Sequence, residues 1–294
     1  MTRLEVLKTY KIYIGGQFPR TESGHYYKLS NKKGKHLANI CLSSRKDFKN
    51  AVTEARKAFN NWSNRTAYNR SQILYRIAEI LESRKDLFIA EIVKLGSTAK
   101  QAEAQTALCI DRLVYYAGWC DKYTQIYSTV NPVASSHFNF SFPEPTGVVA
   151  IIAPEESSLL GLISIIAPVI AGGNTCIVLA SESKPLSAVS FAEVLNSSDV
   201  PGGTINILTG KSSELSKYFA SHMDVNAIIY ARAHKEEIKA VQEAAVKNMK
   251  RVFIYDKINW NLENSQGPEF ILNTLEIKTT WHPVESISVS GAGY

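Results

Sequence analysis

The chain has 294 residues, of which 45% are hydrophobic and 20% charged, and its formal net charge is +6. This composition is typical of a globular protein and excludes a disordered or fibrous chain. The length allows one large or two modest domains with a substantial core. The only tight basic cluster is Lys32-Lys33-Gly34-Lys35, which we interpret as a solvated loop and not as a phosphate or nucleic-acid patch.

The cysteines and the apolar segments indicate a cytoplasmic protein. The four cysteines, Cys41, Cys109, Cys120 and Cys176, lie far apart without a C-x-x-C motif, which favours reduced thiols. The N-terminus lacks the apolar core of a signal peptide, and the longest apolar run, residues 159–170, is too short to span a membrane. We expect no membrane or nucleic-acid partner.

The first third of the chain predicts helices packed around a small β start. Residues 10–18 alternate around Gly15-Gly16 and could pair with residues 26–29 as a hairpin. Residues 44–47 carry an acidic N-cap signal for the first helix. Apolar periodicity predicts further helices at residues 73–81, 87–95 and 100–126. Residues 131–142 then alternate as a strand or hairpin with one aromatic face.

From Pro145 to Asp256 the chain alternates five times between β-branched and helical stretches. Strands are expected at residues 147–153, 175–179, 204–209, 225–230 and 251–255, with helices at 159–170, 187–195, 212–221 and 235–248. Such alternation predicts right-handed crossovers and a parallel sheet with helices on both faces. Ligands bind these sheets at the carboxyl ends of the strands.

An ordered set of short motifs resembles the aldehyde dehydrogenase superfamily. The set includes Ile14-Gly15-Gly16, Trp62, Pro145-Thr-Gly-Val-Val149, Ala171-Gly172-Gly173-Asn174-Thr175, Pro201-Gly202, Asn206-Ile-Leu-Thr-Gly210 and Asn248-Met-Lys-Arg-Val252. The resemblance covers nearly all of the chain through residue 256. It implies an α/β fold with a Rossmann-like five-stranded parallel sheet, an N-terminal helical region and a small β oligomerisation arm. The expected parts are 1–130 (hairpin and helices), 131–146 (arm), 147–256 (a degenerate NAD-binding-type domain), 257–269 (linker) and 270–294 (C-terminal strand and tail).

The resemblance also implies that the cofactor positions have degenerated. Where the family has Pro-Trp-Asn after the first strand, this chain has Pro154-Glu155-Glu156, so Glu156 would face a developing oxyanion that needs a donor. After the second strand Glu182 is kept, but Ala180 cannot supply the family's lysine ammonium. The family's Phe-Thr-Gly-Ser corresponds to Tyr230-Ala231-Arg232-Ala233. Arg232 could bind phosphate through its side chain, but filling the gap left by glycine is the favoured interpretation.

The two chemical residues of the family are missing from their expected places. Tyr255 stands where the family has its general-base glutamate, and a tyrosine is a poor base near neutrality. No cysteine follows Cys176, and about twenty residues lead from Asp256 to the C-terminal strand, so the catalytic domain is expected to be deleted. The resemblance thus implies no catalytic residues and either no NAD(P) or weak NAD(P) binding.

The resemblance assigns the remaining segments to oligomerisation. Residues 274–281 resemble the family's C-terminal strand, and residues 131–142 resemble the arm that it pairs with. The strand could dock on the arm of its own chain or of a neighbour, and the resemblance favours the neighbour. The residues expected to serve this role are Phe138, Phe140, Phe142, Leu275, Ile277 and Trp281.

Other chemistries have weaker support. The chain has neither a glycine-rich dinucleotide fingerprint nor a G-x-S-x-G motif. His222 and His234 have no partner at ligand spacing, so structural or solvated roles are favoured over metal binding. Our leading hypothesis is a protein that is inactive alone and acts as a structural or regulatory subunit, toward itself or a full-length aldehyde dehydrogenase. The alternatives are a subunit active only with a partner's catalytic domain and a weak nucleotide-binding sensor.

Overall fold

A five-stranded parallel sheet forms the centre of the molecule. The structure is a computed structural model, and it describes residues 8–31 and 34–284. The strands run in the order β7-β6-β5-β8-β9, and all neighbours are parallel. Their bounds are β5 Val148–Ile152, β6 Thr175–Leu179, β7 Ile205–Leu208, β8 Ala227–Tyr230 and β9 Arg251–Ile254. The predicted fold class is confirmed, with each strand within two residues of its expected start.

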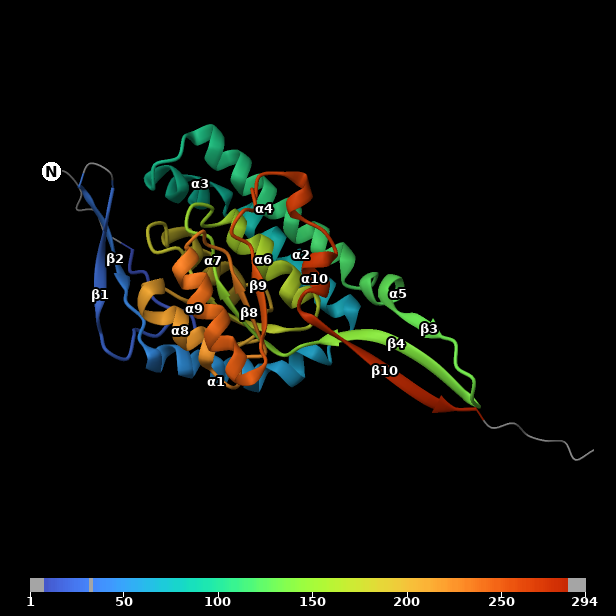
Figure 1. Cartoon of the computed structure of the whole chain (residues 1–294). Helices are drawn as coiled ribbons and strands as arrows, with labels where there is room; N and C mark the ends of the chain where they lie inside the picture. Colours follow the sequence, from blue (N-terminus) through green and yellow to red (C-terminus); the bar gives the residue numbers. More distant parts are fainter. Residues whose placement is uncertain (1–7, 32–33, 285–294) are drawn as a thin grey trace, which may run out of the picture.

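Helices cover both faces of this sheet (Figure 1). One face packs against α2 (Ala67–Ser83), α4 (Ala99–Trp119), α6 (Leu160–Ala171) and α7 (Leu186–Asn196), and α3 (Lys85–Lys94) packs beside them. The other face packs against α1 (Arg45–Ser63), α8 (Ser212–Ser221) and α9 (Lys235–Ala245), which a 3₁₀ turn at Val246–Asn248 follows. Alternate residues of β5 therefore enter different cores. Val149 and Ile151 point to the core beneath α4 and α6, and Ala150 points to the core beneath α1 and α8.

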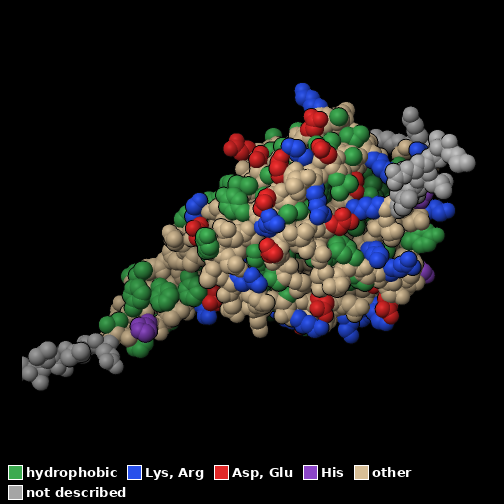
Figure 2. Space-filling view, turned by 180° about the vertical axis from the view of Figure 1, so that it is seen from behind, with side chains coloured by type: hydrophobic (Ala, Val, Ile, Leu, Met, Phe, Trp, Pro, Cys, Tyr) green, Lys and Arg blue, Asp and Glu red, His purple; other side chains and the backbone are tan. Residues whose placement is uncertain are grey.

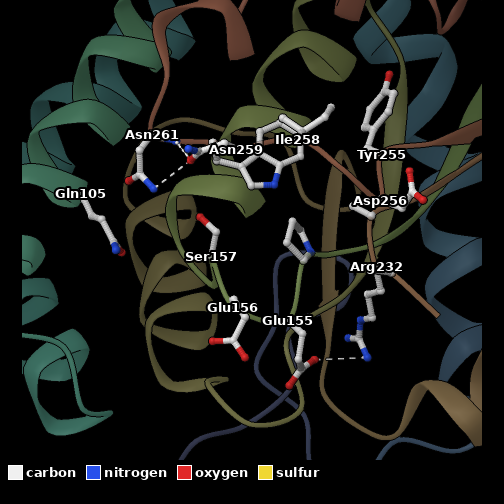
Figure 3. A pocket seen from close by; sticks show the side chains of 14 residues that line it. Gln105, Glu155, Glu156, Ser157, Arg232, Tyr255, Asp256, Ile258, Asn259 and Asn261 are labelled. Atoms are coloured by element: carbon white, nitrogen blue, oxygen red, sulfur yellow. Dashed lines mark hydrogen bonds and ion pairs between the residues drawn. The ribbon is translucent and has the colours of Figure 1, made fainter.

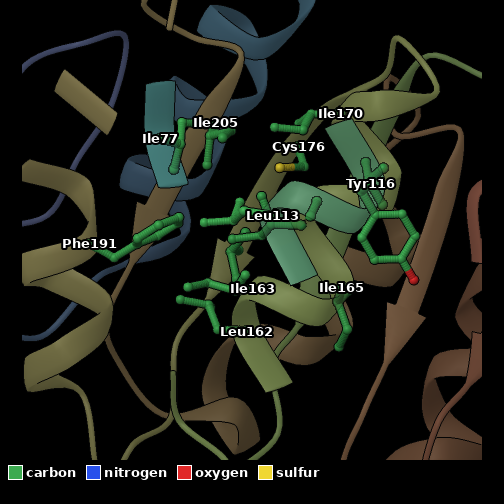
Figure 4. Close-up of a cluster of buried hydrophobic side chains, with 14 of the residues drawn as sticks. Ile77, Leu113, Tyr116, Leu162, Ile163, Ile165, Ile170, Cys176, Phe191 and Ile205 are labelled. Atoms are coloured by element: carbon green, nitrogen blue, oxygen red, sulfur yellow. The ribbon is translucent and has the colours of Figure 1, made fainter. Parts of the chain in front are cut away.

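The larger core lies between the sheet and the layer of α4 and α6. Every residue of α6 is buried, because this helix lies between β-strands on one side and α4 on the other. Figure 4 shows Leu113 of α4 meeting Ile163 of α6 in this cluster. Trp62 closes the core from α1 by donating its indole N–H to the carbonyl of Ile170, 3.0 Å away. Helices that are apolar on all sides belong in such buried layers.

The N-terminal hairpin differs from the expected one. β1 (Tyr26–Ser30) pairs with β2 (His36–Cys41), not with residues 10–18. Gly15 and Gly16 both have positive φ angles and make a tight turn, which interrupts any strand there. Tyr13 forms instead a two-way backbone pair with Ile207 at the edge of the main sheet.

The predicted helix at residues 100–126 is two helices. α4 ends at Trp119, and α5 (Tyr123–Tyr127) follows after a turn. The Cys120 N–H bonds the carbonyl of Ala117, three residues back, which tightens and ends the helix. The turn brings Tyr123 inward, where its hydroxyl accepts a hydrogen bond from Arg70. The other predicted helices and the capping box at Ser44 and Asp47 are confirmed.

An antiparallel arm projects from the body, as Figure 1 shows. It contains β3 (Thr129–Asn131), β4 (His137–Pro145) and β10 (Leu275–Pro283), in the order β10-β4-β3. β10 pairs with β4 of its own chain along all nine residues, so the favoured expectation of a neighbour's arm is not what the structure has. The reason is local, because Thr274 is fixed next to β4: its carbonyl accepts from Asn174 Nδ2 at 2.9 Å and from the Thr146 N–H at 3.1 Å.

Two remaining features bear on earlier expectations. Part of the basic cluster, residues 32–33, and the C-terminal tail from residue 285 lie outside the described residues. In residues 8–31 and 34–284, no helix is long and apolar enough to cross a membrane.

Candidate functional site

The carboxyl ends of β5, β8 and β9 open into a cleft of about 490 Å³ (Figure 3). Polar side chains dominate its lining, which comprises Gln105, Pro154, Glu155, Glu156, Ser157, Ala231, Arg232, Ala233, Tyr255, Asp256, Ile258, Asn259, Trp260 and Asn261. This is the edge where parallel sheets bind ligands. It is therefore the place to compare the predicted site residues with their actual surroundings.

The Arg232 guanidinium bridges the ends of three neighbouring strands. Arg232 follows β8, and its Nε donates to the carbonyl of Ala153, just after β5, at 2.9 Å. One terminal nitrogen donates to the carbonyl of Ala180, just after β6, at 3.0 Å. The side chain is only 9% exposed. A guanidinium held by two backbone carbonyls is committed to the protein and fills the space between the strand ends.

Glu155 completes this arrangement by facing Arg232 with its carboxylate. The Glu155 Oε2 lies 3.3 Å from the other terminal nitrogen of Arg232. Glu155 also accepts from the backbone N–H groups of Ser183 at 2.6 Å and Glu182 at 3.1 Å. Burial opposes ionisation, but the Arg232 charge and these donors outweigh it and lower the pKa of Glu155 below its usual value. The pair is therefore ionic, and it ties the loop after β5 to the loops after β6 and β8.

The two adjacent glutamates diverge. Glu156 is exposed and pairs with Lys184, whereas Glu155 turns toward Arg232 (Figure 3). Carboxylates that point apart cannot share one proton or one metal ion. Within the described chain, no group of three or more His, Cys, Asp or Glu side chains could hold a metal ion.

A second cleft of about 680 Å³ lies on the other side of the ion pair. Glu182, Tyr230 and Ser212 line it, and Glu155, Arg232 and Ala233 line both clefts. The ion pair therefore stands between the two spaces. Burial and the neighbouring Glu155 charge raise the pKa of Glu182.

The predicted cofactor-binding residues are only partly brought together. Arg232, Ala233, Tyr230 and Glu182 gather around the second cleft, whereas Ala231 lines the first. Ala180 is buried and contributes its carbonyl to Arg232. The Tyr230 hydroxyl is engaged with Glu237 at 2.9 Å.

Tyr255 lies where β9 ends and points away from the Glu155–Arg232 pair (Figure 3). Its hydroxyl accepts from Asn273 Nδ2 at 2.9 Å, and its ring meets Trp260 and Phe270 edge-on. Burial raises the pKa of Tyr255 to about 12. A phenol in this state carries its own proton throughout the neutral range and cannot act as a base.

Arg112 is a structurally important residue of the site that sequence reasoning missed. It is buried on α4 and donates to the Ser164 hydroxyl and to the carbonyls of Trp260, Leu262 and Ser265. It therefore holds the segment that closes one side of the cleft against α6. The available signal was an arginine next to Leu113 on an otherwise core-facing helix, which a helical-face analysis could have marked as a buried cation needing partners.

The cysteines offer no nucleophile at this edge of the sheet. All four thiols are free, and three of them, Cys109, Cys120 and Cys176, are buried. Burial raises the pKa of Cys120 to about 12 and that of Cys176 still further. A buried thiol of this kind is inert, because the thiolate is the reactive form.

The arm presents aromatic side chains on both faces. Phe138, Phe140 and Phe142 lie along one face, with ring centroids 5.5 and 5.8 Å apart in succession. The register places Trp281 opposite Asn139 and Ile277 opposite Pro143, which puts both on the other face. Phe138, Ile277 and Trp281 are 46%, 60% and 58% exposed. Figure 2 shows hydrophobic side chains gathered along this projection.

One residue of the predicted oligomerisation set has a different place. Leu275 begins β10 but is 2% exposed and belongs to the core between the sheet and α6. Gly172 approaches it closely, since a Cβ added there would lie 3.0 Å from the leucine side chain. Leu275 thus anchors the arm to the body, and its predicted place on an oligomer surface was wrong.

Comparison with known proteins agrees with this architecture. Residues 18–254 match the model of the aldehyde dehydrogenase family, which is most of the chain. The sheet order, the flanking helices and this match together show that the chain belongs to the aldehyde dehydrogenase family. The predicted resemblance is confirmed.

Several relatives are similar over most of the chain. Cytosolic aldehyde dehydrogenase 1 of Elephantulus edwardii is 30% identical over 260 residues, which are 86% of this chain and 51% of that protein. Cytosolic 10-formyltetrahydrofolate dehydrogenase of Xenopus tropicalis is 30% identical over 249 residues, 83% of this chain and 28% of the other. The chain thus spans about half, or less, of the length of these relatives.

Solved structures have the same fold. PnpE of Pseudomonas sp. WBC-3, in complex with nicotinamide adenine dinucleotide, superposes with a TM-score of 0.80 at 25% identity, covering 84% of this chain and 50% of PnpE. An NAD⁺ complex of aldehyde dehydrogenase from Bacillus cereus gives a TM-score of 0.80 at 23% identity, with the same coverage of both chains. At this identity the second likeness concerns the fold alone.

Proposed function

We propose that this chain is catalytically silent alone and acts as a structural or regulatory subunit, assembling with itself or with a full-length aldehyde dehydrogenase. The observation that carries the proposal is the three-stranded arm, which keeps Phe138, Ile277 and Trp281 exposed on its two faces. Exposed aromatic residues on a projecting sheet mark interaction surfaces, because isolated soluble domains rarely leave such surface uncovered.

The chemistry of the cleft supports the proposal that the chain alone is catalytically inactive. The carboxyl ends of the strands carry Tyr255 with a buried, protonated hydroxyl, and residues 177–294 contain no cysteine. Residues 255–274 connect β9 directly to β10, and β10 is paired with β4 in the arm. The segment between sheet and arm therefore has no room for a further domain. Covalent aldehyde oxidation needs an activated thiolate and a base, and the cleft supplies neither.

The residues present also fit NAD(P) poorly. Arg232 fills the space where the family resemblance places a glycine that lets backbone approach phosphate, and Glu155 adds a negative charge beside it. Ala180 offers a carbonyl that is already bonded, not an ammonium. Each lost charge-assisted contact costs about 1.5–3 kcal/mol, so two losses weaken binding by roughly 10²–10⁴-fold. We therefore propose weak or absent NAD(P) binding, and we derive no step through this cofactor.

A nucleotide-binding sensor is the second candidate, and the cleft beside Glu182 is the observation that favours it. That cleft, of about 680 Å³, is large enough for a nucleotide fragment. A subunit completed by a partner's catalytic domain would need the same space together with the phosphate region that Arg232 fills. We therefore rank it third.

Calorimetry and an aldehyde panel test the proposal. We expect the purified chain to show no saturable heat with NAD or NADP below millimolar concentration and no NADH formation with any aldehyde. A low-micromolar dissociation constant would favour the sensor. Turnover that survives replacement of all four cysteines by serine would contradict silence, because it would require a site other than the one described.

A further inference from the structure

A smaller pocket lies at the opposite end of the sheet from the Arg232 cleft. Its volume is about 300 Å³, and its lining comprises Arg45, Phe48, Lys49, Tyr218, Ser221, His222 and Met223. α8 links the carboxyl end of β7 to the amino end of β8, so the last residues of α8 lie at the amino-terminal edge of a parallel sheet. Neither the cleft residues nor the arm contribute to this pocket.

The cations of this pocket have no carboxylate partners. Within the described chain, neither Arg45 nor Lys49 forms an ion pair or a side-chain hydrogen bond, and no Asp or Glu lines the pocket. Nearby Lys46 and Lys57 on the same helix do have partners, Glu22 and Glu54. Two cations without a carboxylate partner therefore line this hollow of the surface.

The walls of the pocket are apolar and partly fixed. Phe48 is buried and stacks on Phe219 with centroids 4.1 Å apart, and its ring also meets His222 edge-on at 5.6 Å. The Arg45 guanidinium lies 5.3 Å from the Tyr218 ring centroid. Met223 is 67% exposed and offers a flexible apolar side chain at the rim. Low-dielectric walls strengthen the attraction between the cations and an anion in the pocket.

The orientation of His222 adds a donor. Its Nδ1 accepts from the backbone N–H of Asp224 at 3.2 Å, which leaves Nε2 as the protonated nitrogen of the neutral ring. Besides burial, the charges of Lys250, Lys49 and Arg45 lower the pKa of His222, and Asp224 opposes them. Three cations and one exposed carboxylate therefore act on the ring from its surroundings.

We propose that this pocket binds a small phosphate monoester with an apolar body, the phosphate facing Arg45, Lys49 and His222 and the body resting on Phe48, Tyr218 and Met223. Arg and Lys are the side chains that proteins use for phosphate, and a volume near 300 Å³ suits a ligand at the small end of the usual range. The proposal stands apart from the assembly role and does not depend on it.

Phenyl phosphate is the probe, and the ring signals of His222 in the intact chain are the readout. A ¹H–¹³C correlation spectrum at constant ionic strength, with His222→Asn to assign the signal, would follow the titration. We expect saturable His222 shifts and binding at least threefold tighter than for inorganic phosphate, because the latter has no apolar body. Equal affinities for the two anions, or shifts that track ionic strength without saturation, would overturn the proposal.

A pair of charge-matched variants separates a built site from a diffuse field. Lys49→Glu should weaken the binding of phenyl phosphate by roughly tenfold or more, as expected for the loss of one charge-assisted contact. Lys57→Glu makes the same change in net charge on the same helix outside the pocket and should alter the affinity less than twofold. Equal losses in the two variants would show a diffuse effect and contradict the site. Both positions are exposed, and circular dichroism checks that each variant folds.

Discussion

The Arg232 guanidinium and the Glu155 carboxylate lie 3.3 Å apart across the carboxyl edge of the sheet, with the arginine side chain 9% and the glutamate side chain 31% exposed. Arg232 follows β8, and together the two side chains engage backbone groups that follow β5 and β6. At this edge the chain's own side chains hold the strand ends together. The pair therefore has a structural role.

Arg232→Gly should destabilise the fold, because it leaves the carboxylate of Glu155 without its counter-charge and two carbonyls without a donor. We expect the free energy of unfolding to fall by about 1–3 kcal/mol, which is less than the roughly 3–5 kcal/mol typical of breaking a buried pair, because Glu155 is partly exposed. Urea denaturation measures it. Adding Glu155→Gln should recover part of the loss, with a coupling energy of about 1 kcal/mol.

The exposed pair of Lys46 and Glu22 is the control for that cycle. Its coupling energy should not exceed a few tenths of a kcal/mol, the usual value for surface pairs. If the Arg232–Glu155 cycle gives no more than this control, the pair does not lock the edge of the sheet. Calorimetry on the Arg232→Gly, Glu155→Gln double variant is a further check, since it should bind NAD more tightly than the unmodified chain.

Arg112→Met should loosen the segment from residue 260 to residue 265. The change removes the arginine donors for the carbonyls of Trp260, Leu262 and Ser265, although the Leu262 carbonyl keeps a second donor in the Ser265 N–H. We expect a loss of about 2–5 kcal/mol in unfolding free energy. Amide exchange in this segment should also become faster than in the native chain, by a larger factor than in β5. Arg112→Lys keeps the charge but loses the several donors of the guanidinium, so its loss of unfolding free energy should be intermediate. Unchanged exchange in residues 260–265 would mean that Arg112 does not hold the segment.

The buried Lys250 side chain should make the folding stability depend on pH. Burial lowers the pKa of Lys250 to about 8, from an ordinary value of 10.5, although its Nζ donates to the carbonyls of His222 and Val225. Between these two pH values the unfolded chain binds more protons than the folded one, so this residue makes stability rise with pH there. Lys250→Met should abolish the rise.

Chemical denaturation of the native chain and of Lys250→Met at pH 7.5, 8.5 and 9.5 would measure the difference. Only the change with pH is diagnostic, since the variant also loses two hydrogen bonds. A constant difference across the series would contradict the lowered pKa. The window stops below pH 10 because above it the tyrosines of the unfolded chain ionise, while buried ones such as Tyr255, with a pKa of about 12, do not, which adds a second pH dependence.

Much of the fold could be predicted from the sequence, because its signals are local. Unbroken apolar strands such as Val148–Ile152 and the N-cap at Ser44 follow from neighbours in sequence. Positions that depend on contacts distant in sequence could not be predicted. The buried place of Leu275 and the four acceptors of Arg112 both depend on segments many residues away.

The site was predictable in part for the same reason. The sequence indicated that Arg232 fills the strand edge, since this follows from residue type and position after a strand. It did not indicate that Arg232 and Glu155 pair, because the two lie on different loops that only the β5–β8 register brings together. The burial of Tyr255 under Trp260 and Phe270 could likewise not be predicted, because it depends on how the segment after β9 folds back.

Phe140→Asp should weaken assembly through the arm. Phe140 lies in the middle of the aromatic row, and an aromatic hot spot typically contributes at least 2 kcal/mol, so we expect the association constant to fall by about 30-fold or more. Tyr68→Asp on α2, where the tyrosine is 73% exposed, makes the same kind of change away from the arm and should have little effect. Sedimentation velocity compares the two, and equal losses would place the interface elsewhere.

Multi-angle light scattering of the intact chain, alone and mixed with a full-length aldehyde dehydrogenase, tests the assembly role most directly. We expect a mass that is a multiple of the 32.6 kDa chain, or a joint peak with the full-length enzyme. Phe140→Asp should return the chain to the mass of one copy while the variant stays folded. A single peak at the monomer mass, with no joint peak at any ratio of the two proteins, would contradict it.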